Sequence, residues 1–556
     1  MAAADRLSAL SDDLLQRILS FAPAKEAAAS AALSRRWRPL WRRASALNLD
    51  SRPYSHKHSL ADRFDDFFRH AKAALASRLG TAPKRLTLLV VEGAYLVGDS
   101  WDYNTDEDAE LEYDARVAGL LADPAAAALE ELRIASGPYI IMYVPPLASL
   151  PCAATTLRVL ELHRCDLQPP SPSTRLVFPC LTDLSLRNCT YLEGYLQALV
   201  DAAPALTRLA LVDVANKPLK LDGSGKRGRY EESKSFNLPL RLRSPTVTTL
   251  VLETNDSRKD ELDESRNIGI QLDMPSLRSF RYKGFPVKLS LTTPAPGLGR
   301  VDLDTYRRER GYYKCEPAAP MLASFSSTRT LKLDLMAIEE IISDPDNKYG
   351  DQNPCEAIIL PTFLNLKLLE IHGLFKYRNS NTALALATLL RACPALSELR
   401  LRLNMASDYH YGCKIEEQEV GGPFAQSVER FKRLGSMCAE HRDDMELGAV
   451  SDLPDAFTNS CGFGCLMTSL RKVTLEFKSK EVNCFQVQLA KFLVENAMVL
   501  EEMHVEDGYQ FWPDHLWDKL TRWRADALRR KNLPDTAAGF RVYQLANPVE
   551  YPRVHY

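Results

Sequence analysis

A short leucine pattern recurs at a nearly constant interval and constrains the fold of this chain more than any other feature. LRVLELHRCDL begins at Leu157, LTDLSLRNC at Leu181 and LTRLALVDV at Leu206, so consecutive copies start 24 and 25 residues apart. In the first two copies a cysteine, Cys165 or Cys189, follows the leucines at the same offset. Within each copy apolar residues alternate with others, which is the period of a β-strand with one buried face. Each copy therefore predicts one short strand whose leucines need neighbouring copies to cover them.

This interval lies within the range of about 20 to 29 residues that is typical of leucine-rich repeats. Looser copies extend the pattern in both directions: KRLTLLVVEG, LEELRIASG, VTTLVLETN, LRSFRYKG, GRVDLDTY, TRTLKLDL, LKLLEIHGL, LSELRLRL, LRKVTLEF and LEEMHVED. Stretches with helical periodicity lie between some of them, notably TYLEGYLQALVDAAPAL, TALALATLLRACPAL and VQLAKFLVENAMVL. The sequence thus predicts an α/β fold, an irregular leucine-rich-repeat solenoid over residues 80–404 with helices on its convex side. Cys165 and Cys189 are expected to satisfy backbone groups at the turns rather than to react.

Polar segments rich in Gly, Pro, Asp or Asn interrupt the repeats. We expect loop insertions at residues 99–116, 223–235 and 343–354, and a long insertion at 405–465. Further repeats follow at 466–510, and a helix is predicted over 511–533.

Composition excludes several classes of function. Seventy Lys and Arg against 72 Asp and Glu give a net charge of -2, so no overall field favours nucleic acid or an anionic membrane. No run of 18 or more apolar residues predicts a transmembrane helix. The cysteines are scattered; Cys461 and Cys465 have no second pair at metal-binding spacing, so no metal site is predicted. Reduced cysteines favour a cytoplasmic or nuclear protein.

No catalytic motif is present. GSGKRG lacks the spacing of a phosphate-binding loop, and neither GxSxG nor HExxH occurs. We therefore expect no cofactor and no intrinsic enzymatic activity.

The first 45 residues have a different character. Ser11 can cap a helix that carries Asp12 and Asp13 in its first turn, and Pro23 ends it. A second helix is predicted from Ala24 to about residue 33, and SRRWRPLWRR forms a third. Three short helices cannot bury all of their apolar side chains internally, so part of this surface should meet a partner.

Residues 5–45 resemble the F-box of plant F-box proteins. The matching pieces are Leu10 before the acidic helix start, DDLL, ILSF, Pro23, the Lys25–Glu26 pair and LSRRWRPLW; Ser11 stands where the family usually has proline. Residues 466–510 resemble the FBD segment that ends many plant F-box proteins with leucine-rich repeats. The resemblance implies a substrate adaptor that docks on the Skp adaptor of a cullin-RING ubiquitin ligase and holds a protein substrate on its repeats. The residues it assigns to Skp binding are Leu10, Leu14, Leu15, Ile18, Leu19, Leu33 and Trp37.

Other interpretations of the head and body stay open at this point. The head is alternatively a helical cap on the solenoid, or SRRWRPLWRR binds calmodulin or nucleic acid. The whole chain is alternatively a non-catalytic repeat scaffold outside a ubiquitin ligase. Some plant relatives capture a small hormone, so a small-molecule ligand is also left open.

Period-2 alternation places the residues between the repeat leucines on the concave face. Basic residues on it favour a protein partner with an acidic segment, and a merely solvated face is the alternative. The candidate substrate-binding residues are His163, Arg187, Arg281, Lys283, His372, Arg400 and Arg402. The helix at 511–533 is expected to cap the repeats beyond a final strand near Val505; its alternative is a basic amphipathic helix that docks on a membrane or calmodulin.

Overall fold

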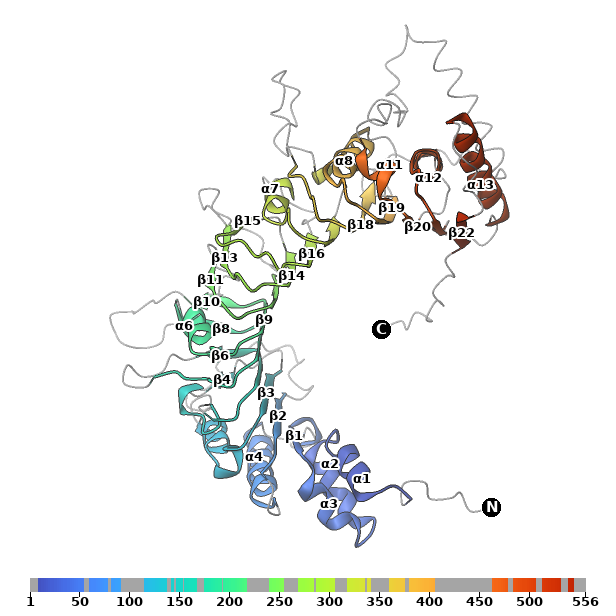
Figure 1. Ribbon diagram of the computed structural model, residues 1–556. Helices are drawn as coiled ribbons and strands as arrows, with labels where there is room; N and C mark the ends of the chain where they lie inside the picture. Colours follow the sequence, from blue (N-terminus) through green and yellow to red (C-terminus); the bar gives the residue numbers. More distant parts are fainter. Residues whose placement is uncertain are drawn as a thin grey trace, which may run out of the picture. The chain divides into compact units, whose positions relative to one another are not determined.

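The computed structural model describes residues 9–54, 60–78, 82–91, 115–137, 142–144, 147–153, 155–167, 175–192, 194–217, 240–254, 269–284, 287–305, 318–335, 338–341, 360–375, 380–405, 463–478, 484–506, 513–531 and 539–544. The chain divides into two compact units near residue 270. The N-terminal unit holds the head and the first repeats, and the C-terminal unit holds the remaining repeats (Figure 1). Each unit is described by itself.

The head folds into short helices, as the sequence predicts. These are α1 (Asp12–Leu19), α2 (Ala24–Ala29), the 3-10 helix η1 (Ser30–Ala32) and α3 (Trp37–Arg43). The Ser11 hydroxyl accepts a hydrogen bond from the backbone N–H of Leu14 at 3.4 Å, which confirms the predicted cap. The single second helix expected from Ala24 is instead α2 followed by η1.

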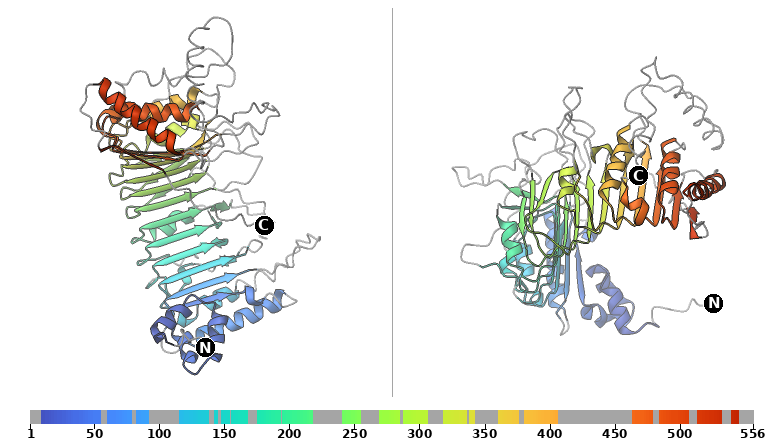
Figure 2. Two further views of the ribbon diagram at one scale, coloured as in Figure 1. Left: turned by 90° about the vertical axis from the view of Figure 1, so that its right-hand side faces the viewer. Right: turned by 45° about the horizontal axis from the view of Figure 1, so that its top comes forward.

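Parallel strands of the N-terminal unit follow the repeat pattern. They are ordered β1 (Ala46–Asp50), β2 (Arg85–Val90), β3 (Glu131–Ser136), β5 (Val159–His163), β7 (Asp183–Arg187), β9 (Arg208–Val212) and β12 (Thr249–Glu253). The repeat leucines are in register, since Leu160 lies opposite Leu184 and Leu184 opposite Leu209. All three are at most 2% exposed. Stacked copies thus bury one continuous leucine core, and the strands lie side by side in the left view of Figure 2.

The turn after each strand leads into a second sheet. Arg164, Asn188 and Asp213 occupy the same place after β5, β7 and β9, and all three have positive φ between 49° and 56°. The chain then enters strands of a second parallel sheet, β4 (Met142–Val144), β6 (Cys165–Leu167), β8 (Thr190–Leu192) and β10 (Ala215–Lys217).

The two repeat cysteines directly follow the turn residues Arg164 and Asn188 and are fully buried. The thiol of Cys165 donates to the carbonyl of His163 at 3.4 Å, and that of Cys189 to the carbonyl of Leu162 at 3.3 Å. Burial raises the pKa of the Cys165 thiol well above its usual value. These contacts fit the structural role that the sequence predicts.

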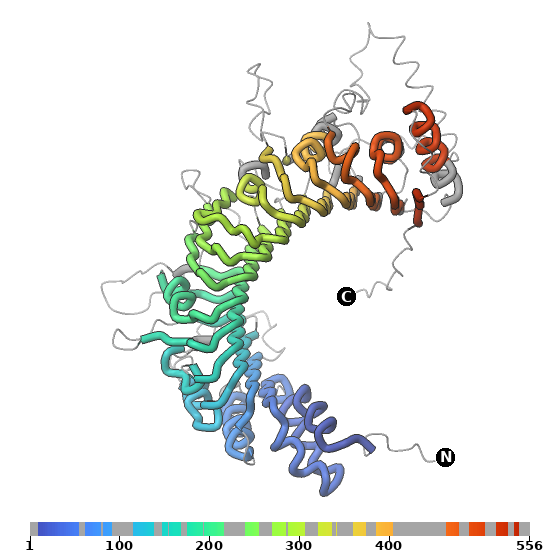
Figure 3. Tube along the Cα trace, in the orientation of Figure 1, coloured from blue at the N-terminus to red at the C-terminus, as the bar shows by residue number. Residues whose placement is uncertain are grey.

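Helices and short turns complete the N-terminal unit. They are η2 (Arg52–Tyr54), α4 (Leu60–Ala76), η4 (Pro124–Ala126), η5 (Leu147–Ser149) and α6 (Tyr195–Asp201), with β11 (Leu240–Arg243) and β13 (Gly269–Asp273) near the division. Neither α4 nor β1 follows from the repeat pattern. The chain forms one coil per repeat in the Cα trace (Figure 3).

The C-terminal unit continues the parallel repeats. Its main strands are β14 (Ser279–Gly284), β16 (Arg300–Thr305), β17 (Thr330–Leu335), β18 (Leu368–Phe375), β19 (Glu398–Met405), β20 (Lys472–Lys478), β21 (Glu502–Glu506) and β22 (Arg541–Gln544), in this spatial order. The short strand β15 (Lys288–Leu291) also belongs to this unit. Its helices are α7 (Ala318–Ala323), η6 (Ile338–Ile341), α8 (Ser380–Ala392), α11 (Gly464–Thr468), α12 (Cys484–Asn496) and α13 (Pro513–Arg530).

The end of the chain differs from the sequence prediction. Helix α13 forms where it was expected and packs on α12, but β22 follows it and pairs parallel with β21. The final strand is therefore not the one near Val505: α13 connects two strands of the sheet as the earlier helices do. The sequence RVYQ is too short to show a repeat, so the pattern gave no sign of it.

The expected insertions at 223–235 and 343–354 lie outside the described residues. So do residues 99–114 of the first insertion, 406–462 of the long one, and with them Cys461.

Candidate functional site

The head has its own small core. Leu15, Leu19, Trp37, Leu40 and Trp41 are all at most 9% exposed and pack together with alanines. The helices are therefore folded as a unit and do not depend on burying α1 against the repeats.

The residues expected to bind the Skp adaptor divide into two groups. Leu15, Leu19 and Trp37 belong to the core, and Leu10 packs against it while partly exposed. The other three project into solvent: Leu14 is 48% exposed, Ile18 46% and Leu33 69%.

A fourth exposed apolar residue was not predicted. Phe21, just after α1, is 69% exposed. Leu14, Ile18 and Phe21 follow one another at four- and three-residue spacing, which places residues on one side of a helix. The helical spacing could have identified Phe21. The Arg85 guanidinium lies 5.8 Å from its ring centroid.

The head is fixed to the first strand by partly buried polar contacts. The Asn48 side chain in β1 donates to the carbonyls of Ser20 and Ala22 at 2.9 and 3.1 Å. The Arg78 guanidinium donates to the carbonyls of Ala44 and Ala46, at 3.0 Å for Ala46. Burial lowers the pKa of Arg78 to about 10. Charge-assisted bonds to otherwise unpaired carbonyls resist separation of the head from β1.

The second candidate surface is the open face of the main strands, on the side opposite the buried leucines. Candidate residues His163 and Arg187 lie on it in the N-terminal unit, and Arg281, Lys283, His372, Arg400 and Arg402 lie on it in the C-terminal unit, as the alternation predicts. The two units differ in how these side chains are partnered.

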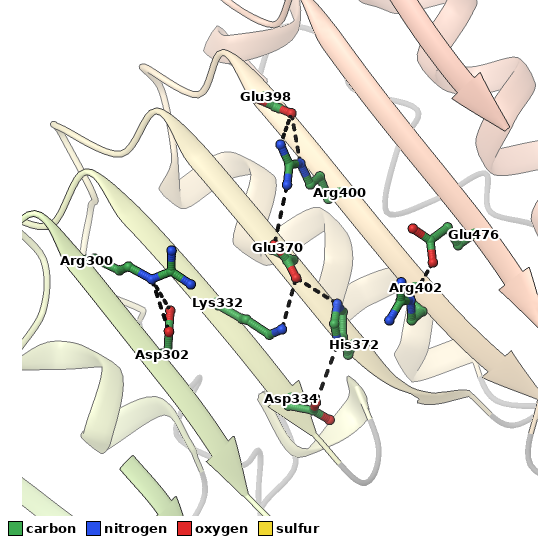
Figure 4. Close-up of polar contacts among 10 residues, drawn as sticks. All are labelled: Arg300, Asp302, Lys332, Asp334, Glu370, His372, Glu398, Arg400, Arg402 and Glu476. Carbon is green, nitrogen blue, oxygen red and sulfur yellow. Dashed lines mark hydrogen bonds and ion pairs between the residues drawn. The ribbon is translucent and has the colours of Figure 1, made fainter. Parts of the chain in front are cut away.

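In the C-terminal unit the open face carries an ion-pair ladder (Figure 4). Glu370 lies at its centre: its carboxylate is 3.1 Å from Lys332 Nζ, 2.9 Å from His372 Nε2 and 3.8 Å from Arg400 Nη1. The other ring nitrogen of His372 is 3.4 Å from Asp334. We call the residues Lys332, Asp334, Glu370, His372 and Arg400 the β17–β19 ladder.

The ladder lowers the pKa of both carboxyl groups. A hydrogen bond from His372 is the main cause for Asp334. For Glu370, burial acts to raise the pKa, but the hydrogen bond and charge of Lys332 and the charges of His372 and Arg400 outweigh it. Both ring nitrogens of His372 thus face carboxylates, Asp334 on one side and Glu370 on the other.

Basic residues elsewhere on this face are also matched. Arg402 forms an ion pair with Glu476, Arg400 contacts Glu398 at 2.8 Å, and Lys283 lies 3.5 Å from Asp304. The sequence predicts that basic residues here bind an acidic partner. In this unit, however, Lys283, Arg400 and Arg402 already form ion pairs with carboxylates of the chain itself.

In the N-terminal unit His163 and Arg187 lie opposite one another on β5 and β7. Arg187 is exposed, and the described residues give its side chain no ion-pair partner. Burial lowers the pKa of His163, and the charges of Arg164 and Arg187 lower it further. The sequence predicted both residues but gave no reason to prefer them to Arg400 or Arg402.

Among the helices of the described residues, none combines the length and apolar character needed to cross a membrane. No three His, Cys, Asp or Glu side chains in that part of the chain are grouped closely enough to hold a metal ion.

Comparison with known proteins defines the class. The F-box domain model matches residues 7–46, and a model for the leucine-rich repeats of the FBD-associated F-box protein At5g56370 matches residues 117–227. These matches cover the head and the first repeats. The chain thus combines an F-box with leucine-rich repeats of the kind found in plant FBD-associated F-box proteins.

Curated relatives extend the similarity along the chain. The F-box/FBD/LRR-repeat protein At1g80470 of Arabidopsis thaliana is 24% identical over 75% of this chain and 75% of its own length. The FBD-associated F-box protein At5g22730 of the same plant is 22% identical over 93% of this chain and 92% of its own. The MEIOTIC F-BOX protein MOF of Oryza sativa subsp. japonica is 30% identical over 38% of this chain and 42% of its own.

Proposed function

We propose that this chain is the substrate-recognition subunit of an SCF-type (Skp–cullin–F-box) E3 ubiquitin ligase. The F-box docks on the Skp adaptor, and the repeats present a protein substrate. F-box proteins with leucine-rich repeats generally act in this way as non-catalytic adaptors. The ubiquitin-transfer chemistry belongs to other subunits.

One observation carries the proposal: the F-box is packed internally but leaves Leu14, Ile18, Phe21 and Leu33 exposed. Large apolar side chains that remain in water beside a complete core mark a protein-binding surface. At about 25 cal/mol per Å² of apolar area, their burial by a partner supplies the free energy of docking. The alternative of a helical cap, with these leucines buried against the repeats, is disfavoured by the same exposure.

The test is isothermal calorimetry of the full chain with a purified plant Skp adaptor. The double variant Leu14→Ala, Ile18→Ala should weaken binding by about 2–4 kcal/mol, or roughly 30- to 1000-fold, as expected for central apolar anchors. Its thermal stability should be nearly unchanged, because both side chains are about half exposed.

The matched control is Leu364→Ala in the C-terminal unit. Leu364 is 68% exposed, so its truncation removes a comparable apolar side chain from a surface outside the F-box. Adaptor affinity should be retained in this control. Full affinity in the double variant would contradict the proposed docking surface.

A further inference from the structure

The basic side chains on the open face are not equivalent. In the C-terminal unit Lys283, Arg400 and Arg402 each contact a carboxylate. In the N-terminal unit Arg187 is exposed and has no such contact among the described residues. An anionic ligand must displace an internal carboxylate at the first three positions but not at Arg187.

Two carboxylates on the strands that carry His163 and Arg187 are already engaged. Glu161, next to His163 on β5, lies 3.5 Å from the Arg133 guanidinium. Asp183, at the other end of β7, forms an ion pair with Arg208. Neither carboxylate is released without breaking an existing pair, and among the described residues the Arg187 side chain has no ion-pair partner.

His163 lies beside Arg187 and adds a second donor. Its pKa is lowered by burial, and the charges of Arg164 and Arg187 lower it further, so the local potential is positive. A bound anion would offset this potential and favour the protonated ring. Across the register the next residue on β3 is Ala135, a small side chain that leaves the imidazole accessible from that side.

On the other side of Arg187, strand β9 presents apolar side chains on the open face. Val212 lies opposite Arg187, and Ala210 lies opposite Ser185. On the following strand, β12, Val251 lies opposite Ala210 and Glu253 lies opposite Val212. All of these side chains are partly exposed. The N-terminal unit therefore presents Arg187 and His163 next to the apolar side chains of β9, with Glu253 beyond them on β12, whereas the β17–β19 ladder presents only paired charges.

We propose that the open face of β5, β7 and β9 binds a protein segment through one anionic side chain held by Arg187 and His163, with an adjacent apolar side chain lying on Ala210 and Val212. This assignment deepens the proposed function, on which it rests, by naming the class of substrate segment. Arginine suits this role because its planar guanidinium holds carboxylate or phosphate oxygens in two parallel hydrogen bonds.

The experiment uses a displayed library of random dodecapeptides, selected on the purified full chain. We expect enrichment of peptides with an acidic residue next to an apolar one. The most enriched peptide is then synthesised with Glu, Gln or phosphoserine at the acidic position, and each version is titrated by fluorescence anisotropy. The Glu or phosphoserine version should bind about tenfold or more tightly than the Gln version, as expected for a charge-assisted pair.

Two variants locate the effect. Arg187→Gln should abolish the preference for the anionic peptides, and the matched control Arg402→Gln should retain it. A phosphoserine peptide that binds more tightly than the Glu peptide identifies a phosphorylated segment, and equal binding identifies a carboxylate. Absence of acidic enrichment, or a preference that survives Arg187→Gln, would overturn the proposal.

The two proposals fail separately. Adaptor binding, measured by calorimetry on the same preparations, depends on the F-box and should be unchanged in Arg187→Gln. If the native chain does not bind the adaptor, the proposed ligase role is wrong. The peptide selection would still test whether Arg187 and His163 bind an anionic side chain.

Discussion

Replacing Arg524 should loosen the end of the repeats. This side chain of α13 is 2% exposed, and its guanidinium donates to the carbonyls of Val494, Ala497 and Met498 at the end of α12. The bonds to Val494 and Met498 are 3.0 and 2.7 Å long. The last carbonyls of a helix have no partners within it, so Arg524 supplies donors to the carbonyls of Val494 and Met498. The carbonyl of Ala497 also accepts from the backbone N–H of Leu500 at 3.2 Å.

The magnitude follows from these bonds. Each hydrogen bond to a charged group contributes about 1.5–3 kcal/mol. Arg524→Met removes all three but also removes the cost of burying a guanidinium, which is several kcal/mol. We therefore expect a net loss of about 2–4 kcal/mol in the local stability of α12. Arg524→Lys should lose about half as much, because a compact ammonium group cannot span carbonyls that a planar guanidinium reaches.

The assay is amide hydrogen exchange of the full chain, which reports local opening without requiring two-state unfolding. Amides of α12 near Leu493 should exchange about 30- to 1000-fold faster in Arg524→Met. The control is Arg529→Met, whose side chain is 77% exposed and pairs with Asp526 at 3.3 Å; such surface pairs contribute about 0–1 kcal/mol. Unchanged exchange of α12 in Arg524→Met would refute the reasoning.

Two further predictions concern the C-terminal unit. Because the pKa values of Asp334 and Glu370 lie below their usual values of 3.8 and 4.5, the stability they contribute is present above about pH 4.5 and is lost as the pH falls through the lowered values. His372→Asn should therefore flatten the decline of melting temperature between neutral and acidic pH, and an unaltered pH profile would argue against the role of His372. Deletion of residues 512–556 removes α13 and β22, so it should lower the melting temperature and increase binding of a hydrophobic dye while adaptor binding persists. A truncated chain that melts at the native temperature would show that this segment stabilises nothing.

The repeats were predictable because their signal is local. Each leucine pattern became a strand, and its leucines are buried in register with those of the next copy. The ends were not predictable in this way: β1 and β22 are short and carry no repeat spacing. Helix α4 did carry a signal, since Phe64, Phe67, Phe68 and Ala71 recur at helical spacing and all are buried.

The candidate sites, too, were predictable only where their sequence signal is local. Helical periodicity separates the exposed Leu14 and Ile18 from the buried Leu15 and Leu19. The ladder was not predictable, because its partners come from distant parts of the chain: Arg402 meets Glu476, which is 74 residues away. Only the register of the sheet shows which arginines are neutralised and that Arg187 has no ion-pair partner among the residues that the structure describes.

Hydrogen exchange of the full chain with and without a plant Skp adaptor tests directly whether the F-box is the docking surface. We expect the adaptor to slow exchange in α1, α2 and η1, around Leu14, Ile18, Phe21 and Leu33, and to leave the strands of the repeats unchanged. Protection confined to the repeats, or no protection at all at saturating adaptor, would contradict it.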